Sequence, residues 1–364
     1  MQDRIYMKRA LALARRGEGR VSPNPMVGAL IVKEGRVIGE GYHRRYGGNH
    51  AEVNAIERAT EPIAGADFYV TLEPCSHYGK TPPCVDRLIE LRPARVIVGT
   101  ADPNPLVAGR GIAALRQAGI DTDVGVLEAE CRRLNEKFFT FMEKKRPFVT
   151  IKFAQTIDGR IAGAAGDSKW ISSEASRKFA HRLRSLHDGV LVGIGTVLQD
   201  DPDLTVRLVR GRNPVRIVVD SSLRIPLNSL VLAHQNRART MIVTSPQADA
   251  EKAALLQERG IEIVRADAAE DGRIDIKALL SVLGAQGISS VLLEGGAALI
   301  TSFLKVRAAD RFYIVTAPRI LGQGIEAVGD LGIEKIAQSI ELHVDGVMKK
   351  DGDIIINARM RETR

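Results

Sequence analysis

The run Glu-Pro-Cys-Ser-His-Tyr-Gly-Lys-Thr-Pro-Pro-Cys from Glu73 to Cys84, preceded by His50-Ala51-Glu52, constrains the fold of this chain more than any other feature. One imidazole and two thiolates bind zinc tetrahedrally and leave one position for a water molecule, whose pKa the metal lowers toward neutrality. A chain that makes this site must bring three separate segments together. The sequence therefore predicts one zinc ion held by His50, Cys75 and Cys84.

Glu52 follows the predicted ligand His50 by two residues. This spacing suits a carboxylate beside the metal-bound water rather than on the metal. Zinc deaminases use such a carboxylate to carry a proton from water to the leaving ammonia, and this sequence resembles their His-x-Glu and Pro-Cys pattern. It departs from the commoner form in one respect, because eight residues rather than two separate Cys75 from Cys84. Glu52 is the predicted catalytic residue.

A closed structural zinc site is the alternative interpretation. His77 or His43 would then be the fourth ligand, and the metal would stabilise the fold and catalyse nothing. The presence of Glu52 beside His50 argues against this alternative. In addition, Pro82-Pro83 leads into a predicted helix, Cys84–Leu91, and a thiol at a helix N-terminus ionises more easily.

Two domains are expected, because 364 residues exceed what one hydrophobic core usually supports. The charged run Lys144-Lys145-Arg146-Pro147 ends a predicted helix at a proline, and a strand pattern, Phe148–Phe153, begins at once. We therefore predict a zinc-dependent deaminase domain over residues 1–146 and a second domain over residues 147–364.

Strand-like and helix-like runs alternate along almost the whole chain, which predicts an α/β architecture. In the first domain the expected helices are Asp3–Arg16, His50–Thr60, Cys84–Leu91, Gly109–Ala118 and Leu127–Lys144, and the expected strands are Val27–Lys33, Arg36–Gly41, Asp67–Thr71, Ala94–Gly99 and Asp121–Val126. The predicted zinc ligands fall at helix starts that follow strands, where open α/β sheets bind ligands.

The N-terminus lacks the apolar region of a signal peptide, and no later stretch is long enough to span a bilayer. We expect a cytoplasmic protein that does not bind membranes. Cys131 is expected to be a small buried residue rather than half of a disulfide. The formal charge of +8 is spread along the chain. It does not by itself indicate nucleic acid, because substrates and cofactors that bear phosphate also need basic residues.

Motifs along nearly the full chain resemble the family of bifunctional riboflavin-biosynthesis deaminase/reductases. In the first half they are Ser22–Gly28, His50-Ala51-Glu52 and the run ending at Cys84; in the second half they are Lys152-Phe153-Ala154, Asp158-Gly159-Arg160, Ser168–Ile171, Asp200–Arg207 and Glu294-Gly295-Gly296. The resemblance implies an N-terminal cytidine-deaminase-like three-layer domain followed by a dihydrofolate-reductase-like domain.

This resemblance also implies two reactions. The family's deaminase half hydrolyses the 2-amino group of a diaminopyrimidinone ribosylamine 5'-phosphate with one Zn²⁺, and its reductase half reduces the ribosyl group to ribityl with NADPH. Family positions that contact the base and ribose phosphate in the deaminase correspond to Asn24, His43, His77, Lys80, Asp102 and Asn104. A turn or loop role is the alternative for these residues. A homo-oligomer is also a family expectation.

In the second half, the resemblance assigns residues to a substrate and to a cofactor. Substrate positions correspond to Lys152, Ser168, Arg184, Leu204, Arg207 and Glu294, and cofactor positions to Ala154, Trp170, Thr196, Asp200, Ser221 (or Ser222), Gly295 and Gly296. Solvent exposure is the alternative for the basic residues. Because helical arginines are usually solvated, we favour Lys152 and Arg207 over Arg184 as phosphate ligands.

The residues themselves support the cofactor assignment only weakly. Gly295-Gly296 follows the predicted strand Ser290–Leu293, and glycines at such a turn let backbone amides reach a dinucleotide phosphate. Gly193-Ile194-Gly195 follows another strand, but Leu198 stands where the dinucleotide fingerprint requires glycine. Hydride transfer depends on positioning, so we predict binding residues and no catalytic residue in this half.

Two hypotheses of other classes compete with this interpretation. A deaminase acting on nucleic acid would suit the basic charge, but it leaves the second half unexplained, and aromatic residues for base stacking are sparse. A zinc-stabilised binding protein without activity is the other. We expect a small-molecule substrate and no nucleic acid partner.

Overall fold

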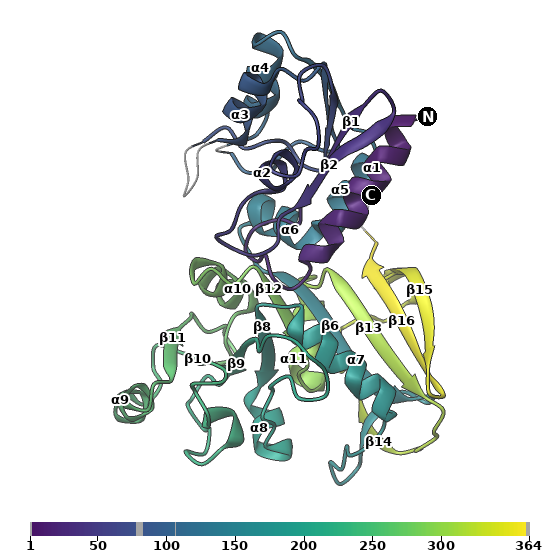
Figure 1. Cartoon of the computed structure of the whole chain (residues 1–364). Helices are drawn as coiled ribbons and strands as arrows, with labels where there is room; N and C mark the ends of the chain where they lie inside the picture. The colour runs from purple at the N-terminus through teal and green to yellow at the C-terminus, as the bar shows by residue number, and fades with distance from the viewer. Residues whose placement is uncertain (1, 78–82, 106, 362–364) are drawn as a thin grey trace. The chain divides into compact units, whose positions relative to one another are not determined.

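The structure, a computed structural model, describes residues 2–77, 83–105 and 107–361 (Figure 1). The chain divides into two compact units, Met1–Lys145 and Arg146–Arg364, which we call the N-terminal and C-terminal units. Within the described ranges, no helix combines the length and apolar character needed to cross a membrane.

The described residues of the N-terminal unit form a five-stranded sheet in the order β2-β1-β3-β4-β5. Strands β3, β4 and β5 are parallel, and β1 runs antiparallel to β2 and β3. The strands are β1 Gly28–Lys33, β2 Arg36–Tyr42, β3 Asp67–Val70, β4 Arg95–Val98 and β5 Asp121–Val124, and the helices are α1 Gln2–Ala14, α2 Ala51–Ile56, α3 Cys84–Leu91, α4 Arg110–Gln117, α5 Glu128–Leu134 and α6 Glu136–Lys144.

Helices cover both faces of this sheet. Side chains of α2, α3 and α4 pack with alternate strand residues such as Ile31 on one face, while α1 and α5 pack with the intervening residues such as Leu30 on the other. Alternation follows from the two-residue period of a strand. Cys131 is fully buried in the second core, as the sequence predicted. The unit therefore has the three-layer arrangement expected from the sequence.

Two predicted helices are wrong in extent. The helix expected over His50–Thr60 ends at Ile56, and Thr60 N–H then donates to the Ile38 carbonyl of β2 at 2.8 Å. The helix expected over Leu127–Lys144 breaks at Asn135 into α5 and α6. The Asn135 amide exchanges two hydrogen bonds with the backbone of Met26, at 2.7 and 2.9 Å. Tertiary hydrogen bonds thus override the local helical pattern at both positions.

Gly41 sets the distance between α2 and the sheet. A Cβ at this position would stand 2.4 Å from the Ala51 carbonyl oxygen and 2.4 Å from the Ala55 nitrogen. Only glycine permits the start of α2 to approach β2 this closely. The residues that begin α2 include two of the predicted functional side chains.

In the part of the chain that the structure describes, the C-terminal unit contains a nine-stranded sheet in the order β11-β10-β9-β8-β12-β6-β13-β16-β15, and β7 and β14 pair separately. The strands are β6 Phe148–Thr156, β7 Arg160–Gly163, β8 Gly189–Gly193, β9 Val215–Val219, β10 Thr240–Thr244, β11 Glu262–Arg265, β12 Ser290–Leu293, β13 Arg311–Ala317, β14 Gly324–Glu326, β15 Leu342–Lys350 and β16 Asp353–Met360; the helices are α7 Glu174–Ser185, α8 Ile194–Asp200, α9 Ala250–Glu258, α10 Ile276–Ala285 and α11 Ala297–Lys305.

The strands from β11 to β13 are parallel, and the hairpin β15–β16 continues the sheet antiparallel. Helices α10 and α11 pack on one face of the sheet, and α8 and α9 pack on the other. Because parallel strands end at one edge, the loops that follow β8, β9 and β12 leave the sheet side by side. This edge is where open α/β sheets bind ligands.

Candidate active sites

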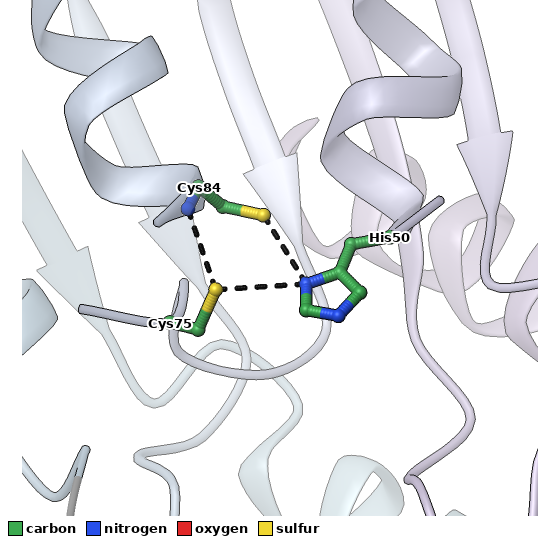
Figure 2. A group of neighbouring side chains, drawn as sticks. All are labelled: His50, Cys75 and Cys84. Atoms are coloured by element: carbon green, nitrogen blue, oxygen red, sulfur yellow. Dashed lines mark hydrogen bonds between the residues drawn. The ribbon is translucent and has the colours of Figure 1, made fainter. Parts of the chain in front are cut away.

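His50, Cys75 and Cys84 meet at one edge of the N-terminal sheet (Figure 2). His50 immediately precedes α2, Cys84 is the first residue of α3, and Cys75 lies in the loop after β3. His50 Nδ1 lies 3.5 Å from Cys75 Sγ and 3.3 Å from Cys84 Sγ. The Cys84 backbone N–H donates to Cys75 Sγ at 3.3 Å.

This geometry fits a zinc ion. A tetrahedral zinc with ordinary bond lengths separates its nitrogen and sulfur ligands by roughly 3.5 Å, close to the separations between His50 Nδ1 and the two sulfurs. Hydrogen bonds from Cys84 and His50 lower the pKa of Cys75 to about 4 despite its burial, so this sulfur is a thiolate. Among the described residues the group has no fourth His, Cys, Asp or Glu member, which disfavours the closed structural site with His43 or His77.

Glu52 lies in the first turn of α2 and is only 4% exposed. Burial raises the pKa of its carboxyl to about 7, with a smaller contribution from the Cys75 thiolate. It is not a member of the three-residue ligand group. A carboxyl that titrates near neutrality can both accept and return a proton at physiological pH.

A cavity of about 350 Å³ opens beside the ligand group, and five of the predicted substrate residues line it: Asn24, His43, His77, Asp102 and Asn104. His43 Nδ1 donates to the Asn49 carbonyl at 3.0 Å, so its Nε2 accepts from the Asn24 amide at 3.2 Å. Burial lowers the pKa of His43 and keeps it neutral. The predicted residue Lys80 lies outside the described residues.

The reductase positions gather at the sheet edge of the C-terminal unit, around two adjoining cavities of about 920 and 830 Å³. We call the first the substrate cavity and the second the cofactor cavity. They share residues that include Ser168, Thr196, Asp200 and Gly296. Every predicted reductase residue lines one or both: Lys152, Ala154, Trp170, Arg184, Leu204, Arg207, Glu294 and Gly295 the first, Ser221 the second, and the shared residues both.

Arg184 and Glu294 form a buried ion pair in the substrate cavity. Arg184 Nε donates to Glu294 Oε1 at 2.7 Å and Nη2 donates to Oε2 at 3.0 Å, and the two side chains are 13% and 10% exposed. The expectation that Arg184 is solvated is therefore wrong. Its helix, α7, packs on the sheet, and the buried carboxylate at the end of β12 provides the compensating charge.

The Lys152 ammonium, in contrast, makes no hydrogen bond or ion pair with any described residue, although the residue is partly buried. Burial lowers the pKa of its ammonium, which Glu294 partly offsets and Arg184 reinforces. A desolvated cation at the wall of a cavity favours a ligand that carries an oxygen or a negative charge.

The cofactor cavity fits a dinucleotide. Apart from its chain neighbours and its own helix, no described heavy atom lies within 4 Å of the position where a Cβ would stand at Gly195. Gly296 immediately precedes α11, and its N–H donates to Thr196 Oγ1 at 3.1 Å. Both glycines thus line the cavity without a side chain of their own, and at Gly296 the Thr196 hydroxyl lies beside the backbone. Trp170 is 61% exposed and stacks with Arg177, whose guanidinium carbon lies 4.5 Å from the ring centroid.

Comparison with known proteins decides the family. Residues 147–356 match the RibD C-terminal domain, and residues 1–100 match the cytidine and deoxycytidylate deaminase zinc-binding region. The riboflavin biosynthesis protein RibD of Aquifex aeolicus is 46% identical over 97% of both chains. That of Escherichia coli strain K12 is 38% identical over 98% of this chain and 99% of its own.

The chain belongs to the RibD family. Solved structures agree. The diaminohydroxyphosphoribosylaminopyrimidine deaminase/5-amino-6-(5-phosphoribosylamino)uracil reductase of Thermotoga maritima matches 99% of both chains with 39% identity and a TM-score of 0.85. Acinetobacter baumannii RibD matches 99% of both chains with 36% identity and a TM-score of 0.89.

Membership in the RibD family makes this chain a bifunctional deaminase and reductase of riboflavin biosynthesis. It uses zinc in the N-terminal half and NADPH in the C-terminal half. The predicted cytidine-deaminase-like and dihydrofolate-reductase-like folds are confirmed. A nucleic-acid deaminase and a zinc-stabilised binding protein are not favoured.

Sequence reasoning missed several residues of the RibD-type deaminase site. Glu73 is 3% exposed and accepts four backbone hydrogen bonds, of 2.9–3.2 Å, from Asp102, Gly109, Gly111 and Ile112. It thereby holds the loop that carries Asp102 and Asn104 against the cavity. Glu73 was visible in the motif, but nothing in its spacing indicated that its partners lie beyond β4.

An apolar wall of the deaminase cavity was also not predicted from the sequence. Phe138, Phe141 and Met142, from the helix that ends the N-terminal unit, line it. The aromatic spacing in the helical segment 136–144 was the available signal. Such a wall limits the access of water to the reacting groups.

The sequence also provided no prediction for His181, which lines the substrate cavity, or for Arg216, which lies near the cavity residue Asp203. His181 accepts from the Arg207 backbone N–H at 3.0 Å, and burial, together with the nearby cations Arg184 and Arg207, lowers its pKa to about 4. Arg216 of β9 is fully buried, donates to the carbonyls of Ala233 and Ala238 at 2.7 Å each, and lies 3.6 Å from Asp203. Asp203 also pairs with Arg207 at 2.6 Å.

Proposed function

We propose that the N-terminal unit hydrolyses the 2-amino group of a diaminohydroxyphosphoribosylaminopyrimidine and that the C-terminal unit then reduces the ribosyl group of the resulting 5-amino-6-(5-phosphoribosylamino)uracil with NADPH. One observation carries the first step: three ligand atoms within 4.8 Å of one another lie beside a buried carboxyl that is not among them. The Thermotoga maritima relative carries the name of both activities.

In the deaminase, zinc held by His50, Cys75 and Cys84 would activate water for attack at the carbon that bears the amino group. Glu52 accepts the proton of that water and returns it to the departing amine, because its carboxyl is buried and titrates near neutrality. This balances the reaction, in which a C–O bond forms, a C–N bond breaks and ammonia leaves.

Around these groups the cavity orients the pyrimidine. Asn24, Asp102 and Asn104 line the cavity with polar side chains, and the neutral His43 keeps the Asn24 amide in place. Among the described residues, His77 Nδ1 is buried without a hydrogen-bond partner, and we assign it to the substrate as well. We keep Lys80 as a phosphate ligand on the family resemblance alone.

In the reductase, NADPH would supply the hydride. Lys152 and Arg207 bind the phosphate of the substrate, while the Arg184–Glu294 pair presents the Glu294 carboxylate to the ribose. Ser168 and Leu204 border the substrate, and Ala154, Trp170, Thr196, Asp200, Ser221, Gly295 and Gly296 border the cofactor. These residues position the two reactants, and no residue is assigned a proton-transfer role.

We further propose that the chain forms a homo-oligomer and works in the cytoplasm. Edge strand β15 exposes Val344 and Val347, which are 52% and 61% exposed, and apolar side chains on a strand edge favour pairing with a second copy. A reducing compartment keeps Cys75 and Cys84 as thiols available to a metal. Light scattering of the purified protein with and without Val347→Lys tests the first proposal.

The Glu52→Gln variant tests the proposed reaction. Zinc-loaded full-length protein is given only the undeaminated substrate and NADPH, and ammonia release and NADPH oxidation are followed together. We expect Glu52→Gln to retain one zinc per chain and to lose deamination by about a thousandfold, and NADPH oxidation should fall with it. Glu90→Gln, whose side chain is 67% exposed on α3, is the control.

Retained turnover in Glu52→Gln would contradict the proton-transfer role. Loss of zinc from this variant would instead mean that Glu52 binds or supports the metal. If NADPH oxidation persists while ammonia release stops, the reductase accepts the undeaminated substrate and the proposed order of the two steps is wrong.

A further inference from the structure

The cofactor cavity extends well beyond the region it shares with the substrate cavity. Its far end is formed by Ser221, Ser222 and Arg224 after β9 and by the loop Asp271–Ile274. None of these residues lines the substrate cavity. The following inference rests on the proposed placement of NADPH, with its nicotinamide toward the substrate cavity and its phosphates near Gly296.

Arg224 is held at this far end by a tight turn. The buried Leu223 adopts a left-handed conformation, with φ of 51°. The fully buried Asp220 fixes the turn by accepting from the Ile225 N–H at 2.8 Å through its carboxylate. Leu223 therefore points into the core while Arg224 lines the cavity. Arg224 makes no hydrogen bond or ion pair with any described residue, so its guanidinium is available to a ligand.

A second arginine is held beside the first. The Ile274 N–H donates to Ser221 Oγ at 3.2 Å, which ties the loop 271–274 to the end of β9. Arg273 Nε lies 3.6 Å from Asp271 Oδ2, but these side chains are 68% and 60% exposed. Exposed pairs of this kind contribute little stability. The Arg273 guanidinium can therefore leave Asp271 for a stronger anion.

The position of the two arginines indicates which part of the dinucleotide they contact. Asp200, the remaining charged residue of the cofactor cavity, belongs to the shared region, where its carboxylate accepts from Ser168 Oγ at 3.1 Å. At the end away from the substrate, the two arginines outnumber the one carboxylate, Asp271, and leave a net positive charge. A dinucleotide whose nicotinamide lies at the shared region places its adenosine ribose at that end.

We propose that Arg224 and Arg273 bind the 2'-phosphate on the adenosine ribose of NADPH and set the preference of the enzyme for NADPH over NADH. A guanidinium binds a phosphate through two parallel hydrogen bonds, which a ribose hydroxyl cannot replace. Ser221 and Ser222 add hydroxyl donors at the same end of the cavity.

The test measures the dissociation constants of NADPH and NADH for the zinc-loaded full-length protein by isothermal titration calorimetry, without substrate. Each of Arg224→Gln and Arg273→Gln weakens NADPH binding by about tenfold, and the double variant by about a hundredfold. NADH binding changes by less than about twofold in every variant. Arg224→Lys keeps the charge and loses only part of the affinity for NADPH.

Arg239→Gln is the matched control, because Arg239 is a 63% exposed surface arginine paired with Glu262, outside both cavities. The inference is overturned if the double variant still prefers NADPH, or if NADH is weakened as much as NADPH. A wild-type protein that binds both cofactors equally overturns it as well. A wild-type protein that binds neither would refute the proposed cofactor placement itself, so the two failures are distinguishable.

Discussion

The two sites of this chain suit different reactions and are built from different kinds of residues. The deaminase cavity, of about 350 Å³, brings a metal-ligand group and a buried carboxyl together within a few residues of two helix starts. The reductase cavities, of about 830 and 920 Å³, are lined by residues dispersed from β6 to β14. Hydrolysis needs reactive groups, whereas hydride transfer needs the substrate and the cofactor held in a fixed position relative to each other. A reaction that depends on reactive groups leaves a compact sequence motif, and one that depends on positioning does not.

Removing the metal should separate the two sites most strongly. We expect Cys84→Ser, or dialysis of the wild type against a chelator, to lower deamination by at least about a thousandfold. Reduction of the deaminated substrate should be unchanged, because the predicted metal ligands all lie in the N-terminal unit. Zinc content, ammonia release and NADPH oxidation are measured on the same sample. A parallel loss of reductase activity would show that the two units are not independent.

Breaking the buried ion pair should damage the reductase site alone. Arg184→Met leaves the Glu294 carboxylate buried without its partner, which destabilises the C-terminal unit by about 3 kcal/mol. The double variant Arg184→Met/Glu294→Met should recover most of this stability but not reductase activity. Urea unfolding followed by circular dichroism, with both activities, provides the comparison. If the double variant recovers activity, the pair is purely structural.

His181 should make the stability of the C-terminal unit sensitive to acid. Its folded-state pKa is lowered from 6.5 to about 4, so the folded protein resists a proton that the unfolded chain accepts. Stability is therefore complete above pH 6.5 and is lost as the pH falls toward 4. Between pH 7 and pH 5 the loss from this group should be about 2 kcal/mol.

The His181→Gln variant isolates this effect. Glutamine retains an acceptor for the Arg207 N–H and does not titrate, so its unfolding free energy should fall less than that of the wild type over the same pH range. Equal pH dependence of the wild type and the variant would assign the acid sensitivity to other groups.

Glu73→Gln should produce the smallest of these effects, and it should appear in the deaminase. Two of the four N–H groups that now face the carboxylate would meet an amide donor instead. We expect a loss of about 1–2 kcal/mol in stability and a higher KM for the deaminase substrate, with the reductase KM unchanged. Steady-state kinetics of deamination and of reduction measure both KM values. An unchanged deaminase KM would show that Glu73 only stabilises the loop.

Much of the fold followed from patterns of a few residues. Alternating strands and helices indicated the α/β class, and the charged run ending at Pro147 contains the position at which the chain passes from the first compact unit to the second. The predicted extent of a helix was wrong where a residue binds a partner distant in sequence. At Asn135 the amide binds the backbone of Met26, more than a hundred residues away in sequence. No local pattern contains such a contact.

The candidate sites divide in the same way. His50, Glu52, Cys75 and Cys84 could be predicted from the sequence, because their pattern resembles that of zinc deaminases and suits zinc chemistry. The burial of Arg184 could not be predicted, since it depends on the Glu294 carboxylate at the end of β12. Glu73, His181 and Arg216 act through backbone groups and charges that only the folded chain places near them.

The sequence by itself indicated the predicted metal-ligand group, its neighbouring carboxyl and the α/β class, because each leaves a recognisable pattern of residue types along the chain. Tertiary structure alone decided which charges are buried, which loops are held and which arginines face the cofactor cavity. Arg224 and Arg273 illustrate the reason: they are 49 residues apart by their numbers, and the folded chain, in which Ser221 and Ile274 share a hydrogen bond, places both at one end of a cavity.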